Sequence, residues 1–137
     1  MIRKELLEEF TYKEEGFKPL VIYKSWRVAV LNYINETDPA RIGRVERHPE
    51  TDEVFVLMRG AGVLFVGEGE PAVKKLYAQK MEPGVIYNVK PRTWHTVDLS
   101  RDASVLIVEN ADTGEKNSEY CKLSGELNEF IQVNGLK

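Results

Sequence analysis

The chain contains two histidines, His48 and His95, and each lies at the edge of a predicted strand beside turn residues. Glu46 precedes His48 by two positions, and residues two apart in a strand point to the same face of a sheet. Glu53 follows His48 after the short polar turn 49–52, so a returning strand can bring its carboxylate beside the imidazole. Proteins use imidazole and carboxylate groups to transfer protons and to bind metal ions. We therefore expect chemistry in the segment from Glu46 to Glu53.

Arg44 shares the predicted face of Glu46 and His48, because it lies two positions further back along the same strand. An unpaired guanidinium inside a folded domain is very costly, so a buried Arg44 requires a partner. One interpretation is that Arg44 binds a carboxylate or phosphate of a substrate through paired hydrogen bonds. The other interpretation is an internal ion pair with Glu46.

Three aromatic residues are further candidates for a binding site. Tyr33 and Tyr87 lie in predicted strands and could present their hydroxyl groups to a ligand, although a strand tyrosine more often packs in the core. Phe55 shares a predicted face with Glu53 and would place apolar surface beside the carboxylate. An apolar pocket with a few convergent polar groups is the usual form of a small-molecule site, so we expect a small-molecule ligand.

About ten short runs rich in Val, Ile, Tyr and Phe recur along the chain and are separated by Gly, Pro, Asn and Asp, which predicts an all-β sandwich or barrel. The runs are Leu20–Tyr23, Trp26–Ile34, Ile42–Arg47, Glu53–Met58, Val63–Val66, Val73–Met81, Val85–Val89, Trp94–Leu99, Ser104–Glu109 and Glu119–Leu123. Apolar residues at helical spacing predict two short helices, Arg3–Phe10 near the N-terminus and Glu126–Val133 near the C-terminus.

The composition is that of an ordinary globular domain. The 137 residues, of which 42% are hydrophobic, fit a single domain over residues 1–137. The net charge of -3 and the scattered Lys and Arg residues give no basic patch, so we expect no nucleic-acid partner. The charged N-terminal segment lacks the apolar run of a signal peptide, and no run is long enough to span a membrane. We expect a cytoplasmic protein in which the single Cys121 packs in a strand.

Three predicted strands are apolar at consecutive positions, so both of their faces need cover. They are Val54–Met58, Val63–Val66 and Val105–Val108. A sheet with one solvent-exposed face normally alternates apolar and polar residues. One face of these strands would line the interior, and the other could meet terminal segments, an opposing sheet or a second copy of the chain. We predict a homodimer.

Two runs of the sequence resemble the motifs of the cupin superfamily. In the run from Glu46 to Gly60, the order and spacing of His48, Glu53 and Gly60 match the first cupin motif. The run from Pro83 to Thr96, with its Gly, strand, Pro and His, resembles the second motif. Together the motifs cover about residues 42–110. The resemblance implies a small double-stranded β-helix, the jelly-roll or cupin barrel, with short N- and C-terminal helices.

The sequence departs from the cupin motifs at two points. Glu46 stands where the first motif has its first His, and the second motif is one residue shorter between Pro91 and His95 and lacks its Gly. The resemblance implies that His48, Glu53 and His95 bind one divalent metal, with Glu46 as a fourth candidate ligand. Two imidazoles and one carboxylate suit Fe and also accept Mn, Zn or Ni. The alternative is a metal-free barrel in which these groups hydrogen-bond one another.

The resemblance implies an enzyme in which His48, Glu53 and His95 are catalytic and the substrate is small and polar or carboxylated. With a metal, the reaction would be of the dioxygenase, isomerase or lyase type. Without one, a histidine paired with a carboxylate could act as a general base. The alternative function is a non-catalytic cupin that binds a ligand or carbohydrate without metal.

Overall fold

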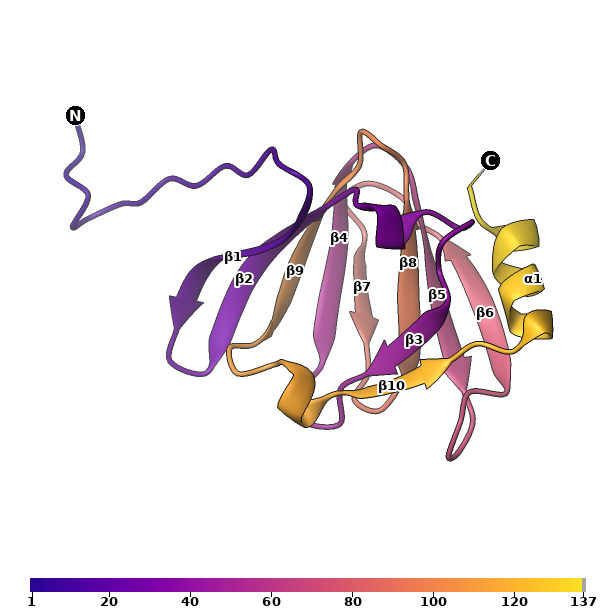
Figure 1. The fold of residues 1–137 in the computed structure, drawn as a ribbon. Helices are drawn as coiled ribbons and strands as arrows, with labels where there is room; N and C mark the ends of the chain where they lie inside the picture. The colour runs from indigo at the N-terminus through magenta and orange to yellow at the C-terminus, as the bar shows by residue number, and fades with distance from the viewer. Residues whose placement is uncertain (137) are drawn as a thin grey trace.

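The computed structural model describes residues 1–136, which form ten strands, two short 3-10 helices and one α-helix (Figure 1). The strands are β1 (Gly16–Tyr23), β2 (Trp26–Asn32), β3 (Arg44–Arg47), β4 (Glu53–Arg59), β5 (Gly62–Glu68), β6 (Lys75–Lys80), β7 (Ile86–Val89), β8 (Trp94–Leu99), β9 (Ser104–Asn110) and β10 (Glu119–Lys122). The helices are η1 (Asn35–Thr37), η2 (Glu115–Asn117) and α1 (Gly125–Asn134).

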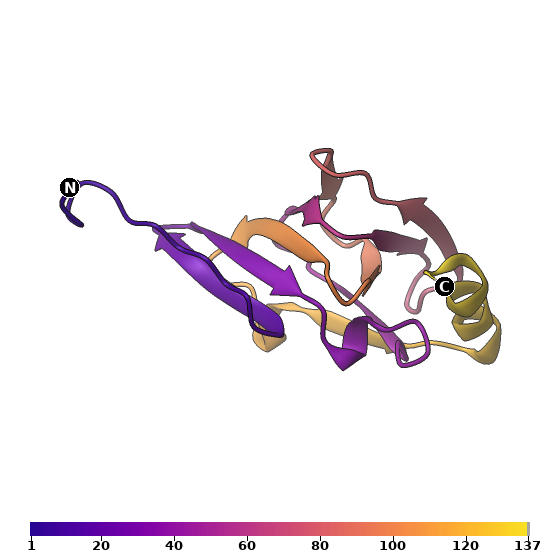
Figure 2. The same cartoon turned by 90° about the horizontal axis from the view of Figure 1, so that it is seen from above.

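The strands form two five-stranded sheets, and all the strand pairs are antiparallel. The first sheet has the order β1-β2-β9-β4-β7, and the second has the order β10-β3-β8-β5-β6. The chain passes back and forth between the two sheets, as the predicted jelly roll requires. The all-β fold is confirmed, but the two sheets do not close into one hydrogen-bonded barrel. In Figure 2 the hairpin of β1 and β2 extends the first sheet beyond the edge of the second.

Two apolar clusters hold the sheets and the helix together. The cluster between the two sheets includes Ala29, Phe55, Leu57, Leu64, Val97, Leu99, Val105 and Ile107. The cluster between the second sheet and α1 includes Val45, Val63, Phe65, Leu76, Trp94 and Ile131. Strand β5 contributes to both clusters, which agrees with the prediction that both of its faces are covered.

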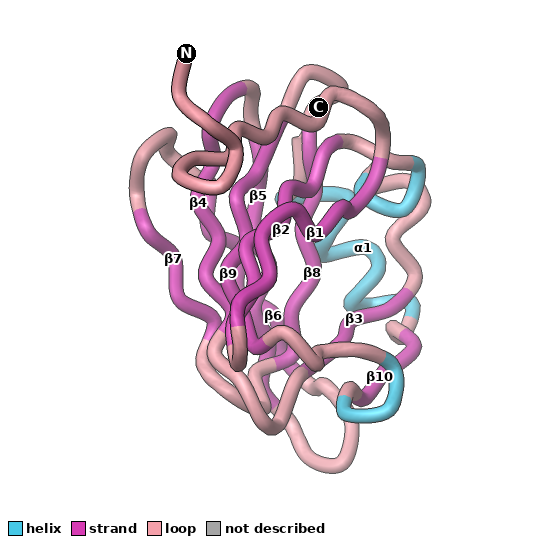
Figure 3. The backbone as a smooth tube through the Cα atoms, turned by 90° about the vertical axis from the view of Figure 1, so that its left-hand side faces the viewer, coloured by secondary structure: helices cyan, strands magenta, loops and turns pink. Residues whose placement is uncertain are grey.

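The C-terminal helix is confirmed as α1. Ser124 caps it by accepting a hydrogen bond from the amide of Leu127, and Ile131 is fully buried against the second sheet. The helical segments, cyan in Figure 3, gather on the side of β3 and β10, away from β7. Within residues 1–136, none of the helices is long and apolar enough to cross a membrane.

The predicted N-terminal helix is wrong. Residues 4–6 form only a turn, in which the amides of Leu6 and Leu7 donate to the carbonyl of Arg3. The segment then runs as an extended arm away from the sheets (Figure 1). Leu6 and Leu7 are more than half exposed, so no tertiary contact stabilises a helix that is too short to persist alone.

Candidate metal and acid–base site

The site lies between the two sheets at one end of the strands that carry it. Glu53 opens β4, His95 is the second residue of β8, and His48 directly follows β3. Glu46 pairs with His95 in the register of β3 and β8. Because side chains alternate along a strand, these pairings aim the acidic and imidazole groups at the same space.

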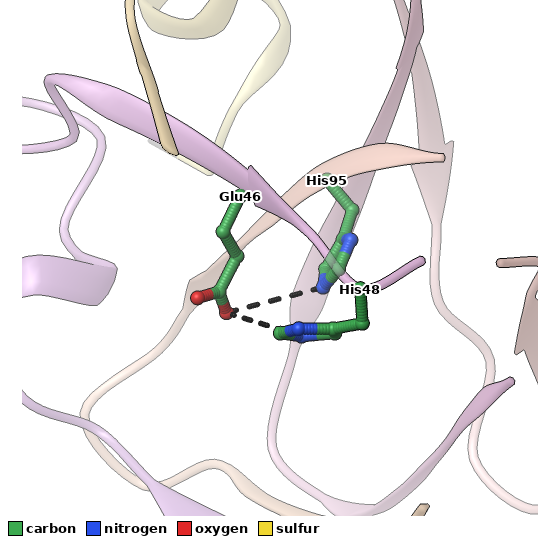
Figure 4. Close-up of side chains that lie close together, drawn as sticks. All are labelled: Glu46, His48 and His95. Carbon is green, nitrogen blue, oxygen red and sulfur yellow. Dashed lines mark ion pairs between the residues drawn. The ribbon is translucent and has the colours of Figure 1, made fainter. Parts of the chain in front are cut away.

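One carboxylate oxygen lies between the two imidazoles. The Oε1 atom of Glu53 is 3.1 Å from Nε2 of His48 and 2.8 Å from Nε2 of His95. Glu46 approaches from the open side, and its Oε1 atom lies 3.8 Å and 3.9 Å from the same two nitrogens (Figure 4). The side chains of His48, Glu53 and His95 are buried, whereas that of Glu46 is 41% exposed. The structure thus brings together the four residues that the cupin resemblance names as ligands.

The far side of each imidazole has its own partner. Nδ1 of His95 donates to the backbone carbonyl of Thr93 at 2.9 Å, because a carbonyl oxygen can only accept. Nδ1 of His48 lies 2.7 Å from the hydroxyl of Ser118. Such second contacts orient metal-binding histidines and leave Nε2 to face the metal.

Two of the inner atoms of this group are buried without a well-formed hydrogen bond. Among the described residues, Nε2 of His95 and Oε1 of Glu53 are buried and have no hydrogen-bond partner of acceptable geometry, despite their 2.8 Å separation. Buried polar atoms are almost always satisfied, so these two atoms mark a place that a bound cation or a water molecule can fill. Glu46, His48 and His95 offer ligand atoms within 4.8 Å of one another, and so do His48, Glu53 and Glu109. The group can therefore hold a metal ion.

The charges in the site reinforce one another. Burial by itself raises the pKa of Glu53, but the contacts with His48 and His95 outweigh it and lower the pKa to about 2. Burial by itself lowers the pKa of His95, and the contact with Glu53 outweighs it and raises the pKa to about 8. At neutral pH Glu53 is therefore an anion, the form that binds a metal, whereas His95 carries a proton that a bound metal would displace.

Comparisons with solved structures identify the fold, whereas comparisons of the sequence find no match. No family model matches the chain, and no curated protein matches it in sequence. A cupin-2 domain protein from Shewanella frigidimarina has a similar structure over 72% of this chain and 84% of its own, with a TM-score of 0.51 and 15% identity. The fold is of the cupin type.

Two further proteins with the cupin fold have similar structures. KdgF from Halomonas matches 82% of this chain and 94% of its own, with a TM-score of 0.51 and 16% identity. Streptomyces Pac13, described as a nucleoside dehydratase, matches 88% of this chain and 97% of its own, with a TM-score of 0.55 and 11% identity. At these identities the similarity shows the fold alone.

A second buried carboxylate lies beside His48 and Glu53, and sequence reasoning missed it. Glu109 of β9 accepts two hydrogen bonds from Arg27 of β2, at 2.7 Å and 3.1 Å. Burial raises the pKa of Glu109 to about 7, the negative charge of Glu53 adds to this, and Arg27 opposes it. The signal in the sequence was a charged residue on the same face as Val105 and Ile107 in an otherwise apolar strand.

A cavity of about 420 Å³ opens in front of these groups. Its apolar wall includes Phe55, whose ring meets the ring of His95 edge to face at 5.9 Å. Its polar wall includes Tyr120 and Ser118, neither of which the sequence analysis named. Phe55 thus lies where it was predicted, beside the carboxylate of Glu53.

The two candidate tyrosines do not line this cavity. The hydroxyl of Tyr33 donates to Asp38 at 3.2 Å, and the hydroxyl of Tyr87 accepts from the amide of Glu82 at 2.9 Å. Tyr87 packs against the cluster between the sheets, in the usual role of a strand tyrosine. Both hydroxyls are therefore engaged in local structure rather than directed at the site.

Arg44 lies at the mouth of the site rather than inside it. Its guanidinium stacks on the ring of Tyr120 at 4.3 Å, and its side chain is exposed. In the described part of the chain it forms no ion pair with Glu46, so that interpretation is not supported. The alternation along β3 is as predicted, but β3 meets β8 only at Glu46, and Arg44 lies beyond that pair in the open.

Proposed function

We propose that this cupin is a metal-dependent enzyme of the lyase or isomerase type that acts on a small, polar, anionic substrate. His48, Glu53 and His95 would hold one divalent ion, Fe, Mn, Zn or Ni, with Glu46 as a fourth ligand. The observation that carries the proposal is the convergence of two imidazole nitrogens on one carboxylate oxygen at the floor of a cavity, with two of these buried atoms left without hydrogen bonds. Two imidazoles with carboxylate oxygens and open positions are a common site for such ions.

A bound divalent ion would act as a Lewis acid on a carbonyl or carboxylate oxygen of the substrate. The protein's own groups provide the proton transfer that a lyase or isomerase needs. Glu109 has a pKa of about 7, so at neutral pH it can both accept and donate a proton. Arg27 fixes its position with two hydrogen bonds. Phe55 and Ile107 form part of the apolar wall of the cavity.

The proton-transferring side chains in the cavity favour a reaction by proton transfer over an oxygen-dependent reaction. Glu109 lines the cavity together with the phenol of Tyr120, so two proton-carrying groups face the space in front of the imidazoles. The fold is compatible with elimination chemistry, because the structurally similar Pac13 is described as a dehydratase.

The charge at the cavity mouth supports an anionic substrate. A groove of about 660 Å³ adjoins the cavity and shares Glu46, His95 and Tyr120 with it. Arg41, Arg44 and Lys122 also line this groove, and none of the three forms an ion pair within residues 1–136. Unpaired cations beside a groove attract a carboxylate or phosphate group. A substrate with its anionic end in the groove would place its other end at the imidazoles.

The proposal is tested by incubating the protein with each of the four metal ions and a panel of hydroxy acids and sugar phosphates in D₂O. Proton NMR would follow loss of carbon-bound hydrogen and appearance of product. We expect turnover of at least one anionic member, and we expect Glu53→Gln to lower its rate by at least about 100-fold. Arg44→Gln should raise KM more than it lowers kcat, because Arg44 would bind a part of the substrate that does not react.

Lys80→Gln, which removes an exposed cation from β6, is the matched control for Arg44 and should change neither constant. If panel members raise the melting temperature of the protein but none exchanges hydrogen or forms product, the chain is a binding protein and the enzyme proposal is wrong.

A further inference from the structure

The two imidazoles of the site differ in what contacts their outer nitrogens. Nδ1 of His95 lies 2.9 Å from the backbone carbonyl of Thr93, which can only accept a hydrogen bond. Nδ1 of His48 lies 2.7 Å from the hydroxyl of Ser118, which can either donate or accept. His95 therefore keeps a proton on Nδ1, whereas the contacts of His48 allow its proton on either nitrogen.

The pairing of β3 with β10 places Ser118 beside His48. In that register Glu119 lies opposite Arg47, and Ser118 and His48 are the next residues beyond this pair. The ion pair between Arg47 and Glu119, at 2.7 Å, joins the two strands next to the contact. Ser118 is half-buried and lines the cavity. The backbone pairing thus holds the hydroxyl against the ring.

The inner nitrogen of His48 has different requirements with and without a metal. Without one, Nε2 lies 3.1 Å from Oε1 of the ionised Glu53. An anionic oxygen attracts an N–H group and repels a bare nitrogen lone pair, so a neutral His48 carries its proton on Nε2. Nδ1 then accepts a hydrogen bond from Ser118. A metal ion binds the lone pair of Nε2, so the proton must then lie on Nδ1 and be donated to Ser118.

We propose that Ser118 is a positioning residue whose hydroxyl reverses its hydrogen bond with His48 when a divalent metal ion binds. The inference rests on the proposed metal site and adds to it a residue that acts through His48 rather than on the ion. The ring gives the Nε2 proton to solvent and takes one from solvent at Nδ1, so its charge does not change. The hydroxyl keeps its own proton and only rotates. His48 thus has a partner at its outer nitrogen in both states, which a carbonyl or an amide N–H alone would not supply.

A purely structural role for Ser118 is the competing interpretation, but other bonds already hold the loop that precedes β10. Arg27 donates to the backbone carbonyls of Ala111 and Thr113 in this loop, at 3.1 Å and 3.0 Å. The pairing of β10 with β3 holds the other end of the loop. Removal of the Ser118 hydroxyl should therefore leave the loop in place and change the hydrogen bonding of His48.

Nitrogen-15 NMR of the histidine rings tests the reversal, because it distinguishes a protonated ring nitrogen from a bare one. In the metal-free chain at about pH 10, above the range in which histidines ordinarily titrate, we expect the proton of His48 on Nε2. In the zinc form we expect it on Nδ1 instead. His95 should carry a proton on Nδ1 in both forms, so it serves as an internal reference. The inference is overturned if zinc binds and His48 shows the same tautomer in both forms.

Two variants of Ser118 separate positioning from structure. Loss of a second contact to a metal-binding histidine typically weakens metal affinity about 10- to 100-fold, so we expect Ser118→Ala to bind zinc about 10-fold more weakly in a calorimeter. Ser118→Thr keeps the hydroxyl and should bind zinc within about 2-fold of the natural chain. Ser25→Ala removes an exposed hydroxyl from the turn between β1 and β2, and this matched control should leave zinc affinity unchanged.

The outcomes separate the role of Ser118 from the proposed function. If zinc does not bind the natural chain, the metal site itself is wrong and the reversal fails with it. If zinc binds the natural chain and Ser118→Ala equally tightly, while circular dichroism shows that both are folded, the metal site stands and the role of Ser118 is overturned.

Discussion

The space between the two sheets has one polar end and one apolar end, although the same strands build both. Along β4 the inward residues are Glu53, Phe55 and Leu57, so the strand changes from charged to apolar. Strand β8 also changes from polar to apolar along its length, and it begins with an imidazole. Strand β9 changes from apolar to charged. The inward residues are His95, Val97 and Leu99 in β8, and Val105, Ile107 and Glu109 in β9.

The two ends serve different purposes. The apolar end buries side chains that need no partner, so it stabilises the fold directly. The polar end buries carboxylates and imidazoles, whose removal from water costs free energy that their contacts only partly return. A cluster of this kind is weak evidence for stability and better evidence for function. Substitutions at the two ends should therefore separate stability from metal binding.

Leu57→Ala should give the largest loss of stability. Leu57 is 1% exposed in the apolar cluster, and a cavity at such a position costs about 2–5 kcal/mol. Urea unfolding would measure this loss, and calorimetry at a temperature where the variant is folded should find its metal affinity unchanged. A loss below about 1 kcal/mol would mean that this end is not the stabilising half of the molecule.

Asp98→Asn should raise the free energy of unfolding, by less than Leu57→Ala lowers it. Asp98 is fully buried behind α1, away from the inter-sheet space, and accepts a hydrogen bond from the amide of Leu136. Burial raises its pKa to about 6. The folded protein therefore holds a proton that the unfolded chain releases above about pH 4, so this group makes the protein less stable as pH rises from 4 to 6.

Asparagine keeps an oxygen for the Leu136 amide and cannot ionise. We expect Asp98→Asn to be more stable than the natural chain by on the order of 1–2 kcal/mol at pH 7 and close to it at pH 4. Unfolding curves across this range would measure the difference. A difference that does not change with pH would show that Asp98 titrates in the folded protein as it does in water.

Replacing His48, Glu53 and His95 together, by Leu, Met and Leu, should have the smallest effect on stability without metal. Exchanging a whole buried cluster of paired polar groups for apolar side chains of similar volume is often neutral or stabilising, whereas removing one partner leaves the others unpaired, so we expect a change within about 1 kcal/mol for the triple variant. The same variant should lose the rise in melting temperature that added metal gives the natural chain. A large loss of stability without metal, or a metal-induced rise that persists, would show that the polar end is structural.

The sequence predicted the parts of the site that follow from local spacing. His48 and Glu53 come together because strand alternation and a short turn determine which way each side chain points. His95 lies far along the chain, and the resemblance to the second cupin motif placed it with them. Glu109 and Arg27 were missed because their contact joins residues 82 positions apart, and only the pairing of β2 with β9 reveals it.

The wrong predictions also have physical causes. The N-terminal segment has helical spacing, but spacing alone does not stabilise a short helix without a surface on which to dock. Arg44 has the predicted strand position, yet β3 pairs with β8 only at Glu46 although β8 continues to Leu99, and no local pattern encodes where two strands separate. The predicted jelly-roll fold is confirmed, and only the closure of its sheets differs, because closure depends on edge pairings far apart in sequence. The homodimer and the cytoplasmic location stay predictions.

The central claim, that the polar end holds one divalent metal ion, is tested most directly by measuring metal content and affinity. The protein would be purified without chelator or nickel resin and examined by elemental analysis, then titrated with Mn(II), Fe(II), Zn(II) and Ni(II) in a calorimeter. We predict about one equivalent of one metal in the natural chain and at least about 100-fold weaker binding in Glu53→Gln. Less than about a tenth of an equivalent, with no heat of binding for any of the four ions, would contradict the account.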